Sequence, residues 1–190
     1  MQADFDDFLL AKGPAHALVA YIVKKYSELG ERDLGRTILQ KLCYFAEAKG
    51  IPLEFRFGVY HYGPFSQEIF DVTENLLIDD VIKDVSDDPR RSKYVPGSSC
   101  EVLLKKFEKP VRKYKNQMDS VVQTFSKLDP TQIELVSTIH YIHSSYCGWD
   151  KGRPSKEQVV AAVLDIKKEK FHEQFIRRVY DILQTAGLLE

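Results

Sequence analysis

The alternation of apolar and polar residues along the chain predicts a mostly helical protein. Between residues 14 and 30, apolar side chains recur every three or four positions, as they do on one face of a helix. Pro14 suits the first turn of that helix because its missing N–H needs no partner there, and Gly30 suits the left-handed end. A second helix is predicted after Asp33, its expected N-cap, and a third after Ser66.

Three short stretches have the composition of β-strands. Residues 55–62 are rich in aromatic side chains, and a Gly-Pro pair ends them. Residues 81–85 and 93–95 flank a polar, charged segment, which predicts a hairpin. A hairpin after three short helices is the element order of a winged helix. We expect the tip of this wing to carry Arg90 and Arg91.

A long helix is predicted from Pro110 onward. Its apolar residues alternate at spacings of three and four, which is the narrow a/d stripe of a coiled-coil-like contact. The stripe consists of Val111, Tyr114, Met118, Val121, Phe125 and Leu128. It can pack on the protein's own body or on a second copy of the chain. The second alternative predicts a homodimer through this helix.

Three more helices are predicted in the last third of the chain, and Ser155 with Gln158 forms a capping box at the start of one of them. The predicted fold is therefore mainly α with short β-strands (α+β). Residues 1–98 form a winged-helix-like unit, and residues 96–99 have the composition of a linker. Residues 99–190 contain the long connecting helix and a helical unit whose element order also resembles a winged helix.

Composition and charge narrow the classes of protein. The chain has 190 residues with 27 Lys and Arg against 28 Asp and Glu, and this balance argues against an overall polyanion binder. No apolar run approaches the roughly 18 residues that span a bilayer, so we expect no membrane partner. The acidic first residues do not resemble a secretory signal, and the three cysteines are far apart. We therefore expect a cytoplasmic protein without a disulfide framework.

A local excess of basic residues contrasts with this neutral total. Such an excess can bind phosphates, but it is also typical of the solvated face of an amphipathic helix. The excess consists of Arg90, Arg91, Lys93, Lys105, Lys106, Lys109, Arg112, Lys113 and Lys115. All of these except Lys115 make up the surface predicted for an alternative function, a nucleic-acid-binding transcriptional regulator. The helix that would enter a groove carries Glu68, Asp71 and Glu74, so we expect that helix to contact protein and not DNA.

The sequence contains no motif of a known catalytic chemistry. It has no Gly-rich phosphate loop, no nucleophile elbow and no H-E-x-x-H. His140, His143 and Cys147 fall on one helical face, but their spacing matches no standard zinc site. Cys43 lies among apolar residues, where a thiol behaves as a small hydrophobe. We therefore predict a protein that is not an enzyme and has neither metal nor cofactor.

Two motifs are the most distinctive part of the chain. They read Leu39-Gln40-Lys41-Leu42-Cys43-Tyr44-Phe45 and Tyr60-His61-Tyr62-Gly63-Pro64-Phe65-Ser66. Over residues 36–77 the chain resembles the bacterial and archaeal YwgA-like proteins, which are related to the SocA-type antitoxin (Panacea) domain. Those families share an L-Q-K-L-x-Y helix and an aromatic strand with Y-G-P. The resemblance implies an antitoxin-like, adaptor or regulatory protein that binds a toxin or another effector protein.

The residues of these motifs also predict a surface by themselves. Gln40 and Tyr44 lie one helical turn apart, and Lys41 lies beside them. The Gly-Pro turn can place His61 and Tyr62 near that helix. The predicted protein-binding patch consists of Gln40, Lys41, Tyr44, His61, Tyr62, Gly63 and Pro64. The alternative is structural, with Lys41 and Tyr62 tying a buried turn to the helix.

Overall fold

The computed structural model describes residues 9–147 and 152–189 and consists of helices with two short antiparallel strand pairs. The predicted class, mainly α with short strands, is confirmed. In the described part of the chain, no helix is long and apolar enough to cross a membrane.

The chain divides into two compact units. Unit 1 comprises residues 1–56 and 66–127, and unit 2 comprises residues 57–65 and 128–190. The boundary expected near residue 98 therefore falls after Lys127, because the helices that follow residue 98 pack on unit 1. No local pattern in the sequence indicates that residues 57–65 belong to the second unit.

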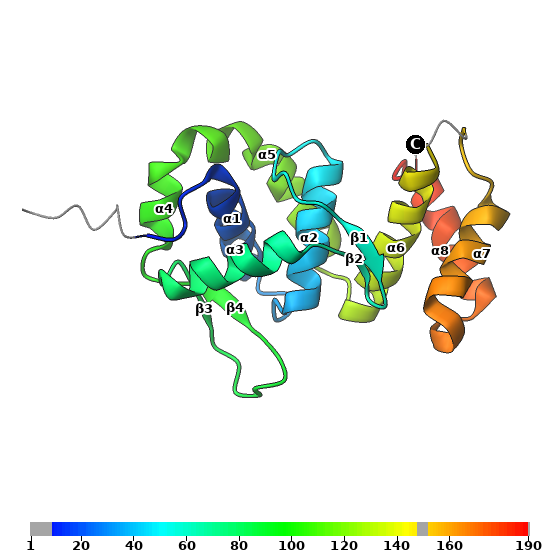
Figure 1. The fold of residues 1–190 in the computed structure, drawn as a ribbon, viewed down its shortest axis with the longest axis horizontal. Coiled ribbons are helices and arrows are strands. Elements are labelled where there is room, and N and C mark those ends of the chain that lie inside the picture. Colours follow the sequence, from blue (N-terminus) through cyan, green and yellow to red (C-terminus); the bar gives the residue numbers. More distant parts are fainter. Residues whose placement is uncertain (1–8, 148–151, 190) are drawn as a thin grey trace, which may run out of the picture. The chain divides into compact units, whose positions relative to one another are not determined.

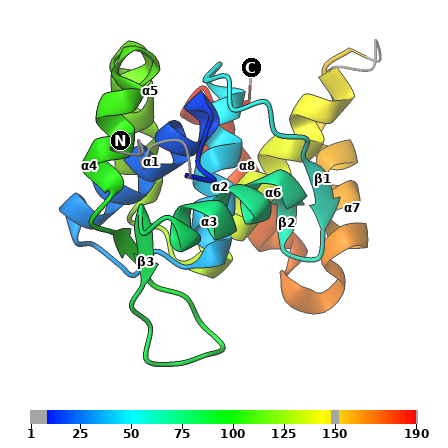
Figure 2. The same cartoon turned by 60° about the vertical axis from the view of Figure 1, so that its left-hand side comes forward.

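Unit 1 holds the first helices, the wing and the long helix. Its elements are α1 (Pro14–Leu29), α2 (Arg36–Ala48), α3 (Gln67–Ile78), β3 (Ile82–Asp84), β4 (Tyr94–Pro96), α4 (Cys100–Lys106) and α5 (Glu108–Phe125). Three helices followed by the β3–β4 hairpin have the element order of a winged helix, as predicted, and the β3–β4 loop extends away from the helices (Figures 1 and 2).

The start of α1 and its end agree with the prediction, whereas the start of α2 does not. Pro14 is the first residue of α1, and Gly30 follows its end with a φ of +62°. Gly35 occupies the N-cap position of α2, so the prediction of Asp33 as the cap was wrong. Asp33 instead forms an ion pair with Lys93, whose Nζ lies 2.9 Å from its Oδ1.

The apolar stripe of the long helix packs in part on the protein's own helices. Met118, Val121 and Phe125 are buried, and α5 contacts both α1 and α2. The Phe125 ring stacks on that of Phe45 in α2, with centroids 3.9 Å apart. At the N-terminal end of the stripe on α5, Val111 and Tyr114 are half-buried. The homodimer through this helix stays a prediction.

Residues 96–99 are not a linker. Pro96 ends β4, and the N–H of Gly97 donates to the carbonyl oxygen of Val81 at 2.8 Å. The N–H of Ser99 donates to the carbonyl oxygen of Asp80 at 3.0 Å. A Cβ atom on Gly97 would lie 2.1 Å from that same oxygen, so glycine is needed for this close approach of two backbone segments.

Unit 2 packs three helices and a hairpin around its own core. Its elements are β1 (Gly58–Tyr60), β2 (Gly63–Phe65), α6 (Pro130–Cys147), α7 (Lys156–Lys167), a 3₁₀ turn η2 (Lys168–Lys170) and α8 (Glu173–Thr185). Ile139, Val163 and Ile176, one from each helix, are fully buried in this core. The capping box of α7 is confirmed, because Ser155 and Gln158 bond each other's backbone N–H groups.

Candidate functional site

The predicted Y-G-P motif forms the β1–β2 hairpin of unit 2. Tyr60 pairs with Gly63, so His61 and Tyr62 make a two-residue tip. Gly63 has a φ of +84°, and a Cβ atom there would lie 2.6 Å from Oγ1 of Thr138 in α6. Glycine is therefore required at this position for two reasons. The backbone conformation is one that other residues rarely adopt, and a side chain would clash where the hairpin contacts α6.

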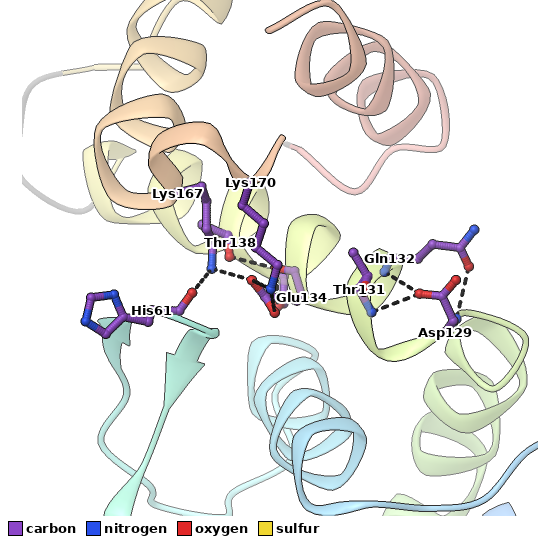
Figure 3. Close-up of polar contacts among 9 residues, drawn as sticks. His61, Asp129, Thr131, Gln132, Glu134, Thr138, Lys167 and Lys170 are labelled. Carbon is purple, nitrogen blue, oxygen red and sulfur yellow. Dashed lines mark hydrogen bonds and ion pairs between the residues drawn. The ribbon is translucent and has the colours of Figure 1, made fainter. Parts of the chain in front are cut away.

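A buried ion pair anchors the tip of the hairpin. Nζ of Lys167 donates to Oε1 of Glu134 at 2.9 Å and to the carbonyl oxygen of His61 at 2.6 Å (Figure 3). The exposed fraction of the side chain is 0% for Lys167 and 3% for Glu134. A charge-assisted bond thus joins the turn of the hairpin to α6 and α7.

Lys170 completes this cluster at its outer edge. Its Nζ lies 2.8 Å from Oε2 of Glu134, and its side chain is 38% exposed. The Glu134 carboxylate therefore receives donors on both oxygens. Burial lowers the pKa of Lys167, and the neighbouring Glu134 carboxylate offsets part of that effect. A buried charge needs such a partner because desolvation disfavours its charged form.

The outer surface of the hairpin is aromatic. The side chains of Tyr60 and Tyr62 are 61% and 66% exposed, and His61 between them is exposed as well. Nζ of Lys170 lies 5.1 Å from the centroid of the Tyr62 ring, a cation–π distance. The Tyr60 ring meets that of Phe65 edge-on at 5.5 Å. Each exposed tyrosine is therefore supported on one side by a neighbour.

A further bond fixes the base of the hairpin. The hydroxyl of Tyr141 in α6 donates to the carbonyl oxygen of Phe57 at 3.0 Å. Together with the Lys167 bond, it holds both the start and the tip of the hairpin against the helices of unit 2. The hairpin thus presents its tyrosines from a fixed backbone.

The other half of the predicted patch lies in unit 1 and is buried. The side-chain amide of Gln40 donates to the carbonyl oxygen of Ser66 at 3.0 Å and accepts from the Ser66 N–H at 3.1 Å. Gln40 thereby ties α2 to the start of α3. Lys41 and Tyr44 are buried too. These three side chains are not accessible to a partner in this conformation.

The seven predicted patch residues therefore fall into two groups. Gln40, Lys41 and Tyr44 belong to unit 1, whereas His61, Tyr62, Gly63 and Pro64 belong to unit 2. Gly63 and Pro64 are buried, which leaves His61 and Tyr62 as the exposed members. The candidate binding surface is the tip of the hairpin.

The basic residues predicted for nucleic acid do not form one surface. Nε of Arg90 lies 3.1 Å from one carboxylate oxygen of Asp88, and Nε of Arg91 lies 3.8 Å from the other. Lys93 is paired with Asp33. The remaining basic residues are exposed on α4 and α5, namely Lys105, Lys106, Lys109, Arg112 and Lys113. The β3–β4 loop and the α4–α5 corner lie at opposite ends of unit 1 (Figures 1 and 2).

The His and Cys residues weighed as ligands and nucleophiles lie in different surroundings. His143 is buried and its Nε2 has no hydrogen-bond partner among the residues that the structure describes, whereas Cys147 is exposed. Among residues 9–147 and 152–189, no three His, Cys, Asp or Glu side chains gather in a way that could hold a metal ion. Burial raises the pKa of the Cys43 thiol, which disfavours the nucleophilic thiolate.

Sequence reasoning missed the ion pair that anchors the hairpin. One signal was available, because Glu134 stands between Ile133 and Leu135 in a helix that contains no other Asp, Glu, Lys or Arg. A carboxylate at a buried position needs a cationic partner. The sequence could not show that this partner is Lys167, which lies on another helix.

Comparisons with known proteins add no relative to this description. Neither the models of known protein families nor the curated proteins include a match to the chain.

Proposed function

We propose that the protein is a non-catalytic protein-interaction module that contacts its partner with the tip of the β1–β2 hairpin. The observation that carries this proposal is the pair of exposed tyrosines, Tyr60 and Tyr62, on a turn held by a buried ion pair. Tyrosine is enriched at protein interfaces because it offers a large contact area for few rotatable bonds. A turn that is already fixed has little conformational entropy left to lose on binding.

The motifs of the chain support a partner of a particular kind. The L-Q-K-L-x-Y and Y-G-P segments resemble those of YwgA-like and SocA-type antitoxin proteins, which favours a toxin or another effector protein as the partner. In this proposal the protein is prokaryotic and cytoplasmic and acts as an antitoxin-like, adaptor or regulatory protein. No cofactor takes part.

The test compares capture of host proteins by matched variants. The double variant Tyr60→Ser, Tyr62→Ser removes both tip side chains. Ile182→Ser removes an apolar side chain that is 57% exposed on α8 of the same unit. All three side chains are exposed, but Tyr60 and Tyr62 also contact Phe65 and Lys170, so we expect the double variant to lower stability by about 1–2 kcal/mol and Ile182→Ser to change it by no more than about 0.5 kcal/mol. Circular dichroism and thermal unfolding check that expectation.

We expect proteins captured by the wild type to be lost with the tip variant and retained with Ile182→Ser. A photoreactive amino acid placed at position 62 should then crosslink to the same proteins. Equal capture by the wild type and the tip variant would contradict the proposal. So would a crosslink pattern identical to that obtained from position 182.

A further inference from the structure

The corner formed by α4 and α5 carries a second surface, independent of the hairpin. Five basic side chains are exposed there over nine residues of sequence. They are Lys105, Lys106, Lys109, Arg112 and Lys113. Within α5 the spacing of three and four residues places Lys109, Arg112 and Lys113 on one side of the helix. The opposite side of α5 is the buried stripe that packs on α1 and α2.

The acidic groups near this face leave most of its charge uncompensated. Glu101 in α4 is engaged by Lys24 of α1, with 2.5 Å between Nζ and Oε1. Asp119 in α5 is engaged by Lys115, also at 2.5 Å. Glu108 is the one further acidic residue between positions 101 and 118.

Most of the basic side chains themselves lack a partner of opposite charge. In the part of the chain that the structure describes, Lys105, Lys109, Arg112 and Lys113 form no ion pair with a carboxylate. Nζ of Lys113 lies 4.9 Å from the centroid of the Tyr114 ring, a cation–π distance. This face therefore carries four exposed positive charges that no carboxylate of the described residues pairs with.

The wing is a weaker candidate for the same role. Arg90 and Arg91 share the carboxylate of Asp88, and Asp87 stands next to it. The two positive charges of the tip are therefore balanced within the same loop. The exposed face of α3 is acidic, with Asp71 and Glu74.

We propose that the α4–α5 face binds the phosphate backbone of duplex nucleic acid without reading its sequence. Within α5, Lys109, Arg112 and Lys113 span roughly 6 Å at 1.5 Å per helical residue, and Lys105 and Lys106 continue the face on α4 across the turn at Phe107. One strand of a duplex carries a phosphate about every 3.4 Å along its axis, so about two phosphates lie along the α5 part of the face. Lysine and arginine side chains at this density match the charge spacing of the backbone.

The surface fits a nucleic acid better than a lipid bilayer. Among the described residues of α4 and α5, Val102 is the one large apolar side chain that is exposed. A helix that binds in the membrane interface needs a broad apolar face to insert, and the apolar face of α5 is already buried on α1 and α2.

The test measures binding of a fluorescent random-sequence duplex of about 20 base pairs to the full-length protein. We expect a Kd of roughly 10⁻⁴ to 10⁻⁶ M, as is usual for sequence-independent contacts. If four side chains contact phosphates, a plot of the logarithm of the association constant against the logarithm of the salt concentration has a slope of about −3.6. Raising the salt from about 50 to 150 mM then weakens binding roughly 50-fold.

Two charge variants locate the contact. Lys109→Ala with Arg112→Ala should reduce the magnitude of the slope by about 1.8, whereas Arg90→Ala with Arg91→Ala should leave it unchanged. All four side chains are exposed, so both variants are expected to fold like the wild type.

Several results would overturn the proposal. They are the absence of binding at low salt, an equal loss with the wing variant, and no loss with the α5 variant. Stronger binding to vesicles containing anionic lipid than to the duplex would also contradict it. The double variant Tyr60→Ser, Tyr62→Ser should lose the protein contact of the hairpin but keep duplex binding. Failure of the proposal for the hairpin can therefore be distinguished from failure of the proposal for the α4–α5 face.

Discussion

Replacing Glu134 by glutamine tests the anchor of the hairpin most directly. The substitution keeps the shape of the side chain but removes its charge, and Lys167 remains with an exposed fraction of 0%. Breaking a buried ion pair by removing one partner destabilises a protein by about 3–5 kcal/mol. We expect Glu134→Gln near the lower end, because the Nζ of Lys167 keeps its bond to the carbonyl oxygen of His61.

The neighbouring lysines supply graded controls for this prediction. Lys170 is 38% exposed, so Lys170→Met should reduce stability by less than about 1 kcal/mol. Lys167→Met leaves Glu134 paired with Lys170 and should have an intermediate effect. The double variant Glu134→Leu, Lys167→Met should cost less than the sum of the two single changes, because no unpaired charge stays buried.

Native-state hydrogen exchange of α6 amides measures these effects inside unit 2. A loss of about 3 kcal/mol accelerates exchange that proceeds through opening of the unit by roughly 100-fold. The acceleration of exchange should be largest for Glu134→Gln, intermediate for Lys167→Met and smallest for Lys170→Met. An acceleration below about threefold for Glu134→Gln, or equal rates for Glu134→Gln and Lys170→Met, would refute the reasoning.

Three further predictions concern other parts of the fold. Gly97→Ala should destabilise unit 1 by about 1–3 kcal/mol in urea unfolding, because its Cβ would lie 2.1 Å from the Asp80 carbonyl oxygen; an unchanged midpoint would contradict the close approach. Burial and the bond to Asp119 raise the pKa of Tyr21 to about 12 from 10.0, so its contribution to stability is present below pH 10 and is lost as the pH rises through about 12. Tyrosinate absorbance of the wild type against Tyr21→Phe checks this, and ionisation of Tyr21 near pH 10 would refute it. Ser155→Ala should cost about 1 kcal/mol by loss of the α7 cap, and thermal unfolding with no change would show that the cap is unimportant.

The parts of the fold that could be predicted are those decided by neighbouring residues. Proline at the start of α1 and glycine after its end act within one helical turn, as does the capping box of α7. The N-cap of α2 was mispredicted because the cap depends on backbone conformation, and Asp33 is held by Lys93, which lies just before β4 and far along the chain.

The candidate site shows the same limit. Its exposed residues, His61 and Tyr62, were predicted from a motif. Their anchor was not predicted, because Glu134 and Lys167 are separated by more than thirty positions and meet only in the folded chain. Periodicity identifies which face of a helix is apolar, but it does not identify the element that covers that face. For this reason the unit boundary predicted from the sequence lay too early, and residues 96–99 were predicted to be a linker.

The membership of residues 57–65 in unit 2 has a consequence for biosynthesis. This segment leaves the ribosome well before the helices on which it folds. At roughly 5–20 residues per second, several seconds pass between synthesis of the hairpin and synthesis of those helices. A fragment ending at Lys127 would likewise expose a hairpin with no helix to cover it. Dissection of this polypeptide into expressible halves therefore requires a rearranged gene, in which the hairpin is transplanted to precede α6.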